Sequence, residues 1–150
     1  MKWLCIDPGI SGTGWCLLEN KKLLRWGNIY SNEDTWLGKA DDICQKIMTE
    51  FKLESLEGRY SSVYCEWPYG VFKAEKNTSI LKLAFLIGKL DSLFGKMYLI
   101  PVQQHIGQLT KDANSYRIHR FFGLKQGTIV KHACDAVSIA KYVLEKGVIK

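Results

Sequence analysis

The first part of the chain contains three short runs in which apolar residues are closely spaced. Residues 2–7 form an apolar run that ends in a carboxylate and is followed by Pro-Gly, which predicts a buried strand stopped by a turn. Two further β-rich runs cover residues 13–18 and 23–30, and the polar sequence at 20–22 is typical of a hairpin turn. We therefore expect three antiparallel strands here.

Helices and strands then alternate along the chain. Asn32 to Asp34 offers N-cap oxygens ahead of apolar residues that recur at helical spacing to about Leu53. The same reasoning predicts a strand at 62–66, a helix at 78–94 capped by Asn77 or Thr78, a strand at 97–102 and a helix at 130–145.

The segment between the last predicted strand and the last predicted helix has a different composition. Residues 103–129 are polar, basic and interrupted by Gly, so we expect a mobile segment with one short helix near 114–122. The whole order, β-β-β-α-β-α-β-α, predicts an α/β fold over residues 1–150 as a single domain. Its mixed five-stranded sheet should carry helices on both faces.

The helix predicted at 78–94 is apolar around most of its circumference. One sheet cannot bury all of that surface, so we expect one stripe to pack on the sheet and another on a second copy of the chain. We assign Leu86 and Leu90 to the outward stripe. The helix therefore predicts a homodimer.

Charge is distributed unevenly along the sequence. Residues 1–70 hold 8 basic and 10 acidic side chains, whereas residues 71–150 hold 13 basic and 5 acidic ones. Between Lys96 and Lys131, six basic residues stand against the single acidic residue Asp112. This asymmetry favours a surface for a polyanion, and the alternative is an ordinary solvated face.

The apolar runs and the cysteine spacing bear on where the protein is expected to be located. No apolar run is long enough to span a bilayer, and no signal peptide precedes the first strand, so we expect a soluble, cytoplasmic protein without a membrane partner. The five cysteines lie far apart without metal-site spacing, which predicts reduced core thiols.

Three carboxylates interrupt apolar surroundings. Asp7 and Glu66 end two strands that we expect to be central, and Asp135 lies in the first turns of the last helix, three residues after His132. Buried carboxylates are costly unless they are paired or bind a metal, so the set favours a divalent cation site. Each carboxylate alone is also compatible with a cap or a salt bridge, and direct ligation by His132 stays open.

Oxygen ligands, with one imidazole, favour Mg²⁺, with Mn²⁺ as a substitute. Two such ions would suit in-line phosphodiester hydrolysis, because one activates water and the other stabilises the leaving oxygen.

Several motifs in the sequence resemble those of a known family. It is similar to RuvC-type Holliday-junction resolvases of the ribonuclease H superfamily, especially short phage-encoded members. The similar motifs are Ile6-Asp7-Pro8-Gly9 with Gly12-Thr13-Gly14, Glu66, Phe72-Lys73 with Asn77 and Leu81-Lys82-Leu83, Pro101 through Lys111, and His132-Ala133-Cys134-Asp135-Ala136. Together these motifs extend over essentially the whole chain.

The resemblance implies a homodimeric endonuclease that binds a four-way DNA junction and makes paired nicks. It assigns Asp7, Glu66, His132 and Asp135 to the catalytic metal site and Lys111 to the scissile region. The implied DNA-binding residues are Phe72, Tyr69, Lys73, Lys82, Lys89, Lys111, Arg117 and Arg120. Lys82 and Lys89 are also compatible with plain solvated helix residues.

Two departures from the family pattern and two competing functions accompany this interpretation. About three extra residues separate Glu66 from Phe72 relative to bacterial members, so the aromatic that wedges into the junction is Phe72 or, as second choice, Tyr69. The region 112–129 aligns poorly, which leaves the cut-site preference open and permits other branched DNA as substrate. The competing functions are a junction-binding protein without catalysis and a ribonuclease H-like nuclease acting on RNA–DNA hybrids.

Overall fold

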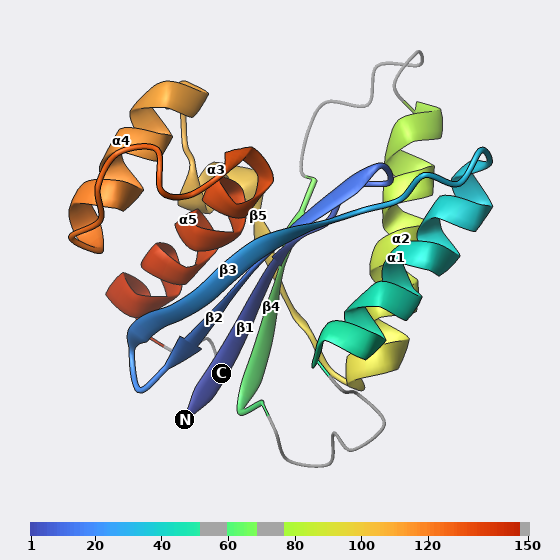
Figure 1. The fold of residues 1–150 in the computed structure, drawn as a ribbon, viewed down its shortest axis with the longest axis horizontal. Coiled ribbons are helices and arrows are strands. Elements are labelled where there is room, and N and C mark those ends of the chain that lie inside the picture. The colour runs from blue at the N-terminus through green and yellow to red at the C-terminus, as the bar shows by residue number, and fades with distance from the viewer. Residues whose placement is uncertain (52–59, 69–76, 148–150) are drawn as a thin grey trace.

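The structure, a computed structural model, describes residues 1–51, 60–68 and 77–147 (Figure 1). Its elements are β1 (Lys2–Asp7), β2 (Gly12–Glu19), β3 (Lys22–Tyr30), α1 (Trp36–Phe51), β4 (Ser62–Trp67), α2 (Asn77–Phe94), β5 (Tyr98–Pro101), α3 (Val102–His105), α4 (Lys111–Phe121) and α5 (Lys131–Lys146). The predicted order of strands and helices is confirmed, with α3 added.

The strands form one mixed sheet in the order β3-β2-β1-β4-β5. β1 pairs antiparallel with β2 and parallel with β4, and β5 runs parallel to β4. Asn20 and Lys21 connect β2 to β3 with φ angles of 50° and 67°. Positive φ at both central residues is the geometry of a tight hairpin turn whose twist matches that of the strands, so the predicted hairpin is confirmed.

Helices cover both faces of the sheet, as expected. α1 and α2 lie against one face, and α3, α4 and α5 lie against the other (Figure 1). The alternation along β1 shows how the strands serve both layers, because Leu4 and Ile6 belong to the core beneath α1 and α2 while Trp3 and Cys5 belong to the core beneath α5. The sheet is therefore buried on both sides.

Two local predictions are wrong. The cap of α1 is Thr35, whose Oγ1 accepts the Gly38 N–H at 3.0 Å, rather than a residue of 32–34. The segment 103–129 is ordered, with α3 and with an α4 that begins at Lys111 rather than near 114. Ile118 is fully buried there, which anchors the polar segment to the core.

The outward stripe of α2 also differs from the prediction. Leu86 and Leu90 are fully buried against the sheet. Leu81 and Phe85 point outward instead and are 69% and 41% exposed. An apolar repeat that continues around a helix does not by itself indicate which stripe faces the sheet, so the pattern assigned the two stripes the wrong way round.

All five cysteines are buried and none forms a disulfide, as predicted. Among the residues that the structure describes, no helix has the length and apolar character needed to cross a bilayer.

Candidate active site

The alternation of side chains brings Asp7 and Glu66 to one face at one end of the sheet. Asp7 is in phase with Trp3 and Cys5 on β1, and Glu66 is in phase with Tyr64 on β4, all of which face α5. β1 and β4 are parallel, with Cys5 opposite Tyr64. The two carboxylates therefore follow neighbouring strands at the same edge.

α5 adds Asp135 to this edge because it packs very closely on β2. Gly14 is the β2 partner of Asp7 in the register. A Cβ at Gly14 would lie 2.0 Å from the carbonyl oxygen of His132, so only glycine allows the first turn of α5 to approach. Gly9 is equally restricted, since a Cβ there would lie 2.4 Å from the Gly12 carbonyl oxygen. This supports a packing role for these glycines.

The carboxylates interact electrostatically. Burial, followed by the negative charges of Glu66 and Asp135, raises the pKa of Asp7 well above its usual value. Burial and the charge of Glu66 likewise raise the pKa of Asp135. Mutual repulsion of this kind is what a bound cation relieves.

Lys111 contributes positive charge to this cluster. It is the first residue of α4, where the Thr110 side chain caps the helix by accepting the Ala113 N–H at 3.2 Å. Its positive charge opposes the rise in the pKa of both Asp7 and Asp135 without cancelling it. The structure thus brings Lys111 to the predicted site, and its side chain is exposed.

His132 lies at the rim of the same site. Its ring meets that of Tyr30 edge-on, with 6.1 Å between the ring centroids. Its charge contributes the smallest of the effects that lower the pKa of Asp135, after Lys111 and His105. His132 therefore lies within electrostatic range of Asp135.

His105 is a site residue that the sequence analysis missed. It ends α3 and is buried, and its Nε2 lies 2.9 Å from Oε2 of Glu66. The contact does not have the geometry of a hydrogen bond, and neither atom has a hydrogen-bond partner among the described residues. A single histidine in a polar segment gives no sequence signal for such a contact.

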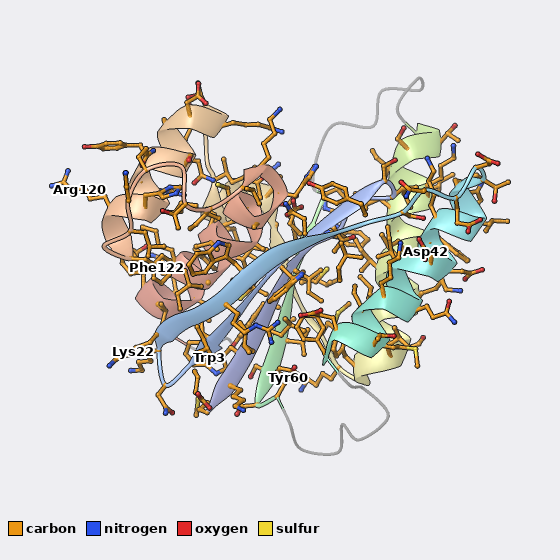
Figure 2. The ribbon with its side chains drawn as sticks, viewed as in Figure 1. Trp3, Lys22, Asp42, Tyr60, Arg120 and Phe122 are labelled. Atoms are coloured by element: carbon orange, nitrogen blue, oxygen red, sulfur yellow. The ribbon has the colours of Figure 1, made fainter. Side chains whose placement is uncertain are left out.

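The predicted DNA-binding residues are in different surroundings. Arg120 extends outward from α4, away from the sheet (Figure 2). Arg117 turns inward and donates to the His105 carbonyl oxygen and to Asn114 Oδ1. Lys82 lies 5.9 Å from the Trp36 ring centroid, and Lys89 forms an ion pair with Asp41. Tyr69, Phe72 and Lys73 lie outside the described residues.

The donor chemistry of the site fits a divalent cation, although the ligands are not gathered around a point. Three carboxylates and an imidazole share one end of the sheet, and two of the carboxylates have raised pKa values. Within residues 1–51, 60–68 and 77–147, no three His, Cys, Asp or Glu side chains converge closely enough to enclose an ion. The arrangement therefore supplies suitable oxygens without a preformed cage.

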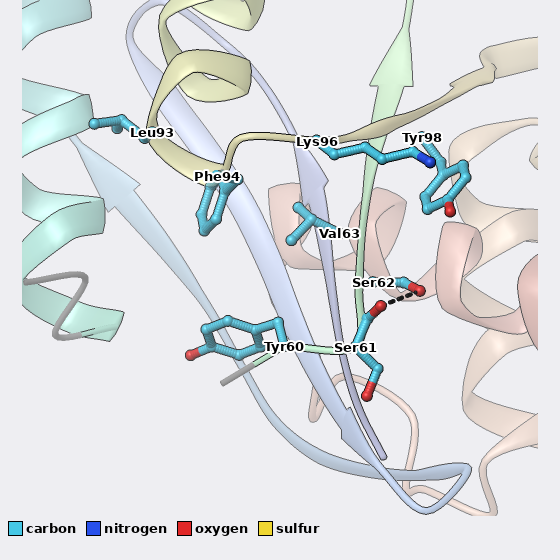
Figure 3. Close-up of a pocket in the computed structure, with 8 residues that line it drawn as sticks. All are labelled: Tyr60, Ser61, Ser62, Val63, Leu93, Phe94, Lys96 and Tyr98. Atoms are coloured by element: carbon cyan, nitrogen blue, oxygen red, sulfur yellow. Dashed lines mark hydrogen bonds between the residues drawn. The ribbon is translucent and has the colours of Figure 1, made fainter. Parts of the chain in front are cut away.

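A separate hollow of about 190 Å³ lies at the opposite end of the sheet (Figure 3). It is lined by Tyr60 to Val63 at the start of β4, by Leu93 and Phe94 at the end of α2, and by Lys96 and Tyr98. Because Glu66 lies at the other end of β4, this hollow is not part of the carboxylate site.

Comparison with known proteins identifies the fold. No protein-family model and no curated protein sequence matches the chain. Among solved structures, T. thermophilus RuvC in complex with Holliday junction substrate matches with a TM-score of 0.72 and 21% identity, over 98% of this chain and 97% of that one. A second Thermus thermophilus RuvC structure matches with a TM-score of 0.67 and 21% identity, over 97% and 96% of the two chains. The chain therefore has the RuvC fold, a ribonuclease H-like arrangement, over nearly its whole length.

Proposed function

We propose that the chain is a structure-selective DNA endonuclease that resolves four-way junctions, and other branched DNA, by paired phosphodiester hydrolysis. The observation that carries this proposal is that Asp7, Glu66 and Asp135 lie at the same end of a RuvC-like sheet and interact electrostatically. One of the solved structures that it resembles is a complex with a Holliday junction substrate. Buried, free cysteines fit a cytoplasmic enzyme.

The proposed cofactor is Mg²⁺, with Mn²⁺ as a substitute and two ions in each site. Asp7, Glu66 and Asp135 would hold the ions, with His132 as an additional ligand. Bound ions of this kind activate water and stabilise the leaving oxygen of a phosphodiester. The raised pKa values of Asp7 and Asp135 support this assignment, because a cation offsets the burial and the repulsion that raise them.

Lys111 is proposed to bind the scissile region of the DNA. It is exposed, and its charge reaches both Asp7 and Asp135. A phosphate approaching the carboxylates would gain a cationic partner from this side chain, which offsets repulsion between the phosphate and the carboxylates.

The wider DNA surface is proposed to include Arg120, Lys82 and the basic residue Lys73. Arg120 is available to a ligand because it is exposed on α4. Arg117 and Lys89 already bind acceptors within the chain, so their support for DNA binding is weaker. Any contact by Arg117 would compete with the bonds it makes to His105 and Asn114.

A homodimer is proposed through the outer face of α2. Leu81 and Phe85 are one helical turn apart and exposed, and the Trp36 ring contacts that of Phe85 with 5.4 Å between centroids. We name these three residues the α2 patch. An exposed apolar cluster of this kind is typical of a protein interface, and paired nicks on a symmetric junction require two active sites.

Cleavage assays with three labelled substrates test the function. We expect nicking of a four-way junction in Mg²⁺, with little cleavage of linear duplex or of RNA–DNA hybrid. Asp7→Asn, Glu66→Gln and Asp135→Asn should each abolish nicking while junction binding in Ca²⁺ persists, because metal ligands are lost but basic residues are not. Binding without nicking by the unaltered chain would favour the non-catalytic alternative, and preferential cutting of hybrid would favour the ribonuclease H alternative.

A further inference from the structure

His105 makes a buried contact with Glu66, and the proposed reaction assigns no role to this histidine. Its side chain has no exposed surface, and its Nε2 lies 2.9 Å from Oε2 of Glu66, whose side chain is 17% exposed. Neither ring nitrogen has a hydrogen-bond partner in the described part of the chain, and Glu66 Oε2 is the polar atom that the structure places in contact with Nε2. A buried polar ring is costly unless it is paired, so the Glu66 carboxylate is the group that accounts for its position.

Two hydrogen bonds to its carbonyl oxygen hold the backbone of His105 in place. The Ser138 Oγ donates to the His105 carbonyl oxygen at 3.0 Å, and Nη2 of Arg117 donates to the same oxygen. Ser138 is on α5 and Arg117 is on α4. Two helices therefore anchor the short helix α3, and through it the imidazole next to Glu66.

Asn114 continues this network to the second carboxylate. Its Oδ1 accepts from Nη2 of Arg117 at 2.7 Å and from Oγ of Ser138 at 3.1 Å. The single Ser138 hydroxyl hydrogen is shared between Asn114 Oδ1 and the His105 carbonyl oxygen. Arg117 can only donate, so it fixes the orientation of the amide and leaves Nδ2 facing Asp135. Nδ2 then lies 3.4 Å from Oδ1 of Asp135. Asn114 is almost completely buried, so this orientation is held by packing as well.

We propose that His105 and Asn114, clamped together by Arg117 and Ser138, are positioning residues for the metal ligands. This buried bridge holds one oxygen of Glu66 and one of Asp135 from behind, so that the other oxygens face the position of the cation. The inference rests on the proposed function only in taking these carboxylates as metal ligands. Partners that orient ligating groups in this way typically change metal affinity 10–100-fold when they are removed.

Mn²⁺ binding to the DNA-free protein, followed by electron paramagnetic resonance, tests the bridge. His105→Leu removes the donor at similar volume, and we expect it to weaken Mn²⁺ binding about 10–100-fold. His105→Gln places an amide nitrogen near the position of Nε2, and it should bind Mn²⁺ within about threefold of the unaltered protein if donation to Glu66 is the function of His105.

His119 provides a matched control. His119 is buried like His105, but it lies on α4. Its ring nitrogens contact the Ser115 carbonyl oxygen and the Ile129 N–H, and neither contacts a carboxylate. His119→Leu should therefore lower the Tm without changing the Mn²⁺ affinity of the folded protein. Should His105→Leu fail to fold, Asn114→Ala tests the Asp135 end of the bridge, with the same 10–100-fold loss expected.

The outcomes separate this inference from the proposed function. A folded His105→Leu or Asn114→Ala protein with unaltered Mn²⁺ affinity would overturn the bridge, and so would equal losses in His105→Gln and His105→Leu. If the expected Mn²⁺ differences are found but the unaltered chain cuts no branched DNA, the bridge stands and the nuclease proposal fails. If junctions are cut but the affinities do not change, the nuclease stands and the bridge fails.

Discussion

At the scale of single residues, Asp7 makes the metal-free protein less stable. Its pKa is raised in the folded state by burial and by the charges of Glu66 and Asp135. The folded protein therefore binds a proton at Asp7 more tightly than the unfolded chain, whose aspartates titrate near 3.8. Proton binding at Asp7 therefore stabilises the folded state fully at pH values below 3.8. This stabilisation is lost as the pH rises through the raised pKa of Asp7.

Asp7→Asn should accordingly stabilise the protein in EDTA at pH 7, because the buried charge is gone. We expect a higher Tm in thermal unfolding, because the folded state no longer buries a charge next to Glu66 and Asp135. The advantage over the unaltered chain should shrink as the pH is lowered toward 4. Asp42→Asn is the control, since its partner Lys46 lowers the pKa of Asp42 and neutralisation should bring no gain. An Asp7→Asn protein less stable than the original in EDTA would contradict this account.

The aromatic wedge concerns Phe72 and Tyr69, which lie outside the described residues. Unstacking base pairs at a junction costs a few kcal/mol, and an inserted aromatic returns about 1–3 kcal/mol per stacked base. Phe72→Ala should therefore slow junction cleavage much more than it weakens binding. The fluorescence increase of 2-aminopurine at the crossover should also be lost. Survival of both signals in Phe72→Ala and in Tyr69→Ala would place the wedge elsewhere or exclude one.

Some residues of the candidate site could be predicted from the sequence, and others could not. Asp7 and Glu66 could be predicted because a carboxylate that ends an apolar strand is visible in the pattern, and parallel pairing brings such ends together. The metal itself was predicted from chemistry and stays a prediction. His105 could not be found, because its contact with Glu66 depends on how α3 is anchored by Arg117 and Ser138, far along the chain.

At the scale of elements, the approach of α5 to β2 determines the geometry of the site. A methyl group at Gly14 would overlap the carbonyl oxygen of His132, so Gly14→Ala must displace the first turn of α5. We expect a destabilisation of about 1–3 kcal/mol and a large loss of cleavage, measured by thermal unfolding and junction nicking.

Gly88→Ala is the matched control for Gly14→Ala. A Cβ there meets nothing within 4 Å, and Gly88 lies inside α2. Alanine should stabilise this helix by about 0.5–1 kcal/mol and leave the packing of α5 on β2 unchanged. Full activity of Gly14→Ala would show that close packing at this residue is not needed.

α4 illustrates why the segment 103–129 was mistaken for a mobile one. The helix has few apolar residues, and its buried positions include Asn114 and His119 as well as Ile118. Asn114 is satisfied by Arg117 and Ser138, and His119 by backbone groups. A polar network of this kind orders a segment that hydrophobic periodicity alone assigns to a loop.

At the scale of the whole molecule, the α2 patch should determine the oligomeric state. Leu81→Glu and Phe85→Glu place a charge on its exposed surface, so we expect each to shift a dimer toward monomer in sedimentation experiments. Leu24→Glu is the control, since Leu24 is also exposed but belongs to β3 at the far side of the sheet. Equal dimer affinity in all three variants would remove α2 from the interface.

Junction binding should weaken steeply with salt, since Lys and Arg side chains release condensed counterions when they bind phosphates. With about 6–10 phosphate contacts, affinity should fall about 10³–10⁵-fold between 50 and 200 mM salt. Filter binding or anisotropy in Ca²⁺ measures this slope. A nearly flat response would reject an interface based on the basic residues of the chain.

The position of α5 in the chain has a consequence for folding. α5 follows all five strands in sequence, yet it packs on β1 and β2 and supplies Asp135 opposite Asp7. Such long-range contacts form late and slowly, because a long loop must close before they contribute. During synthesis, all five strands would therefore be available before α5 can cover one apolar face of the sheet. A nascent or truncated chain that lacks α5 would hold Asp7 and Glu66 without Asp135, so it should be prone to aggregate and unable to cut DNA.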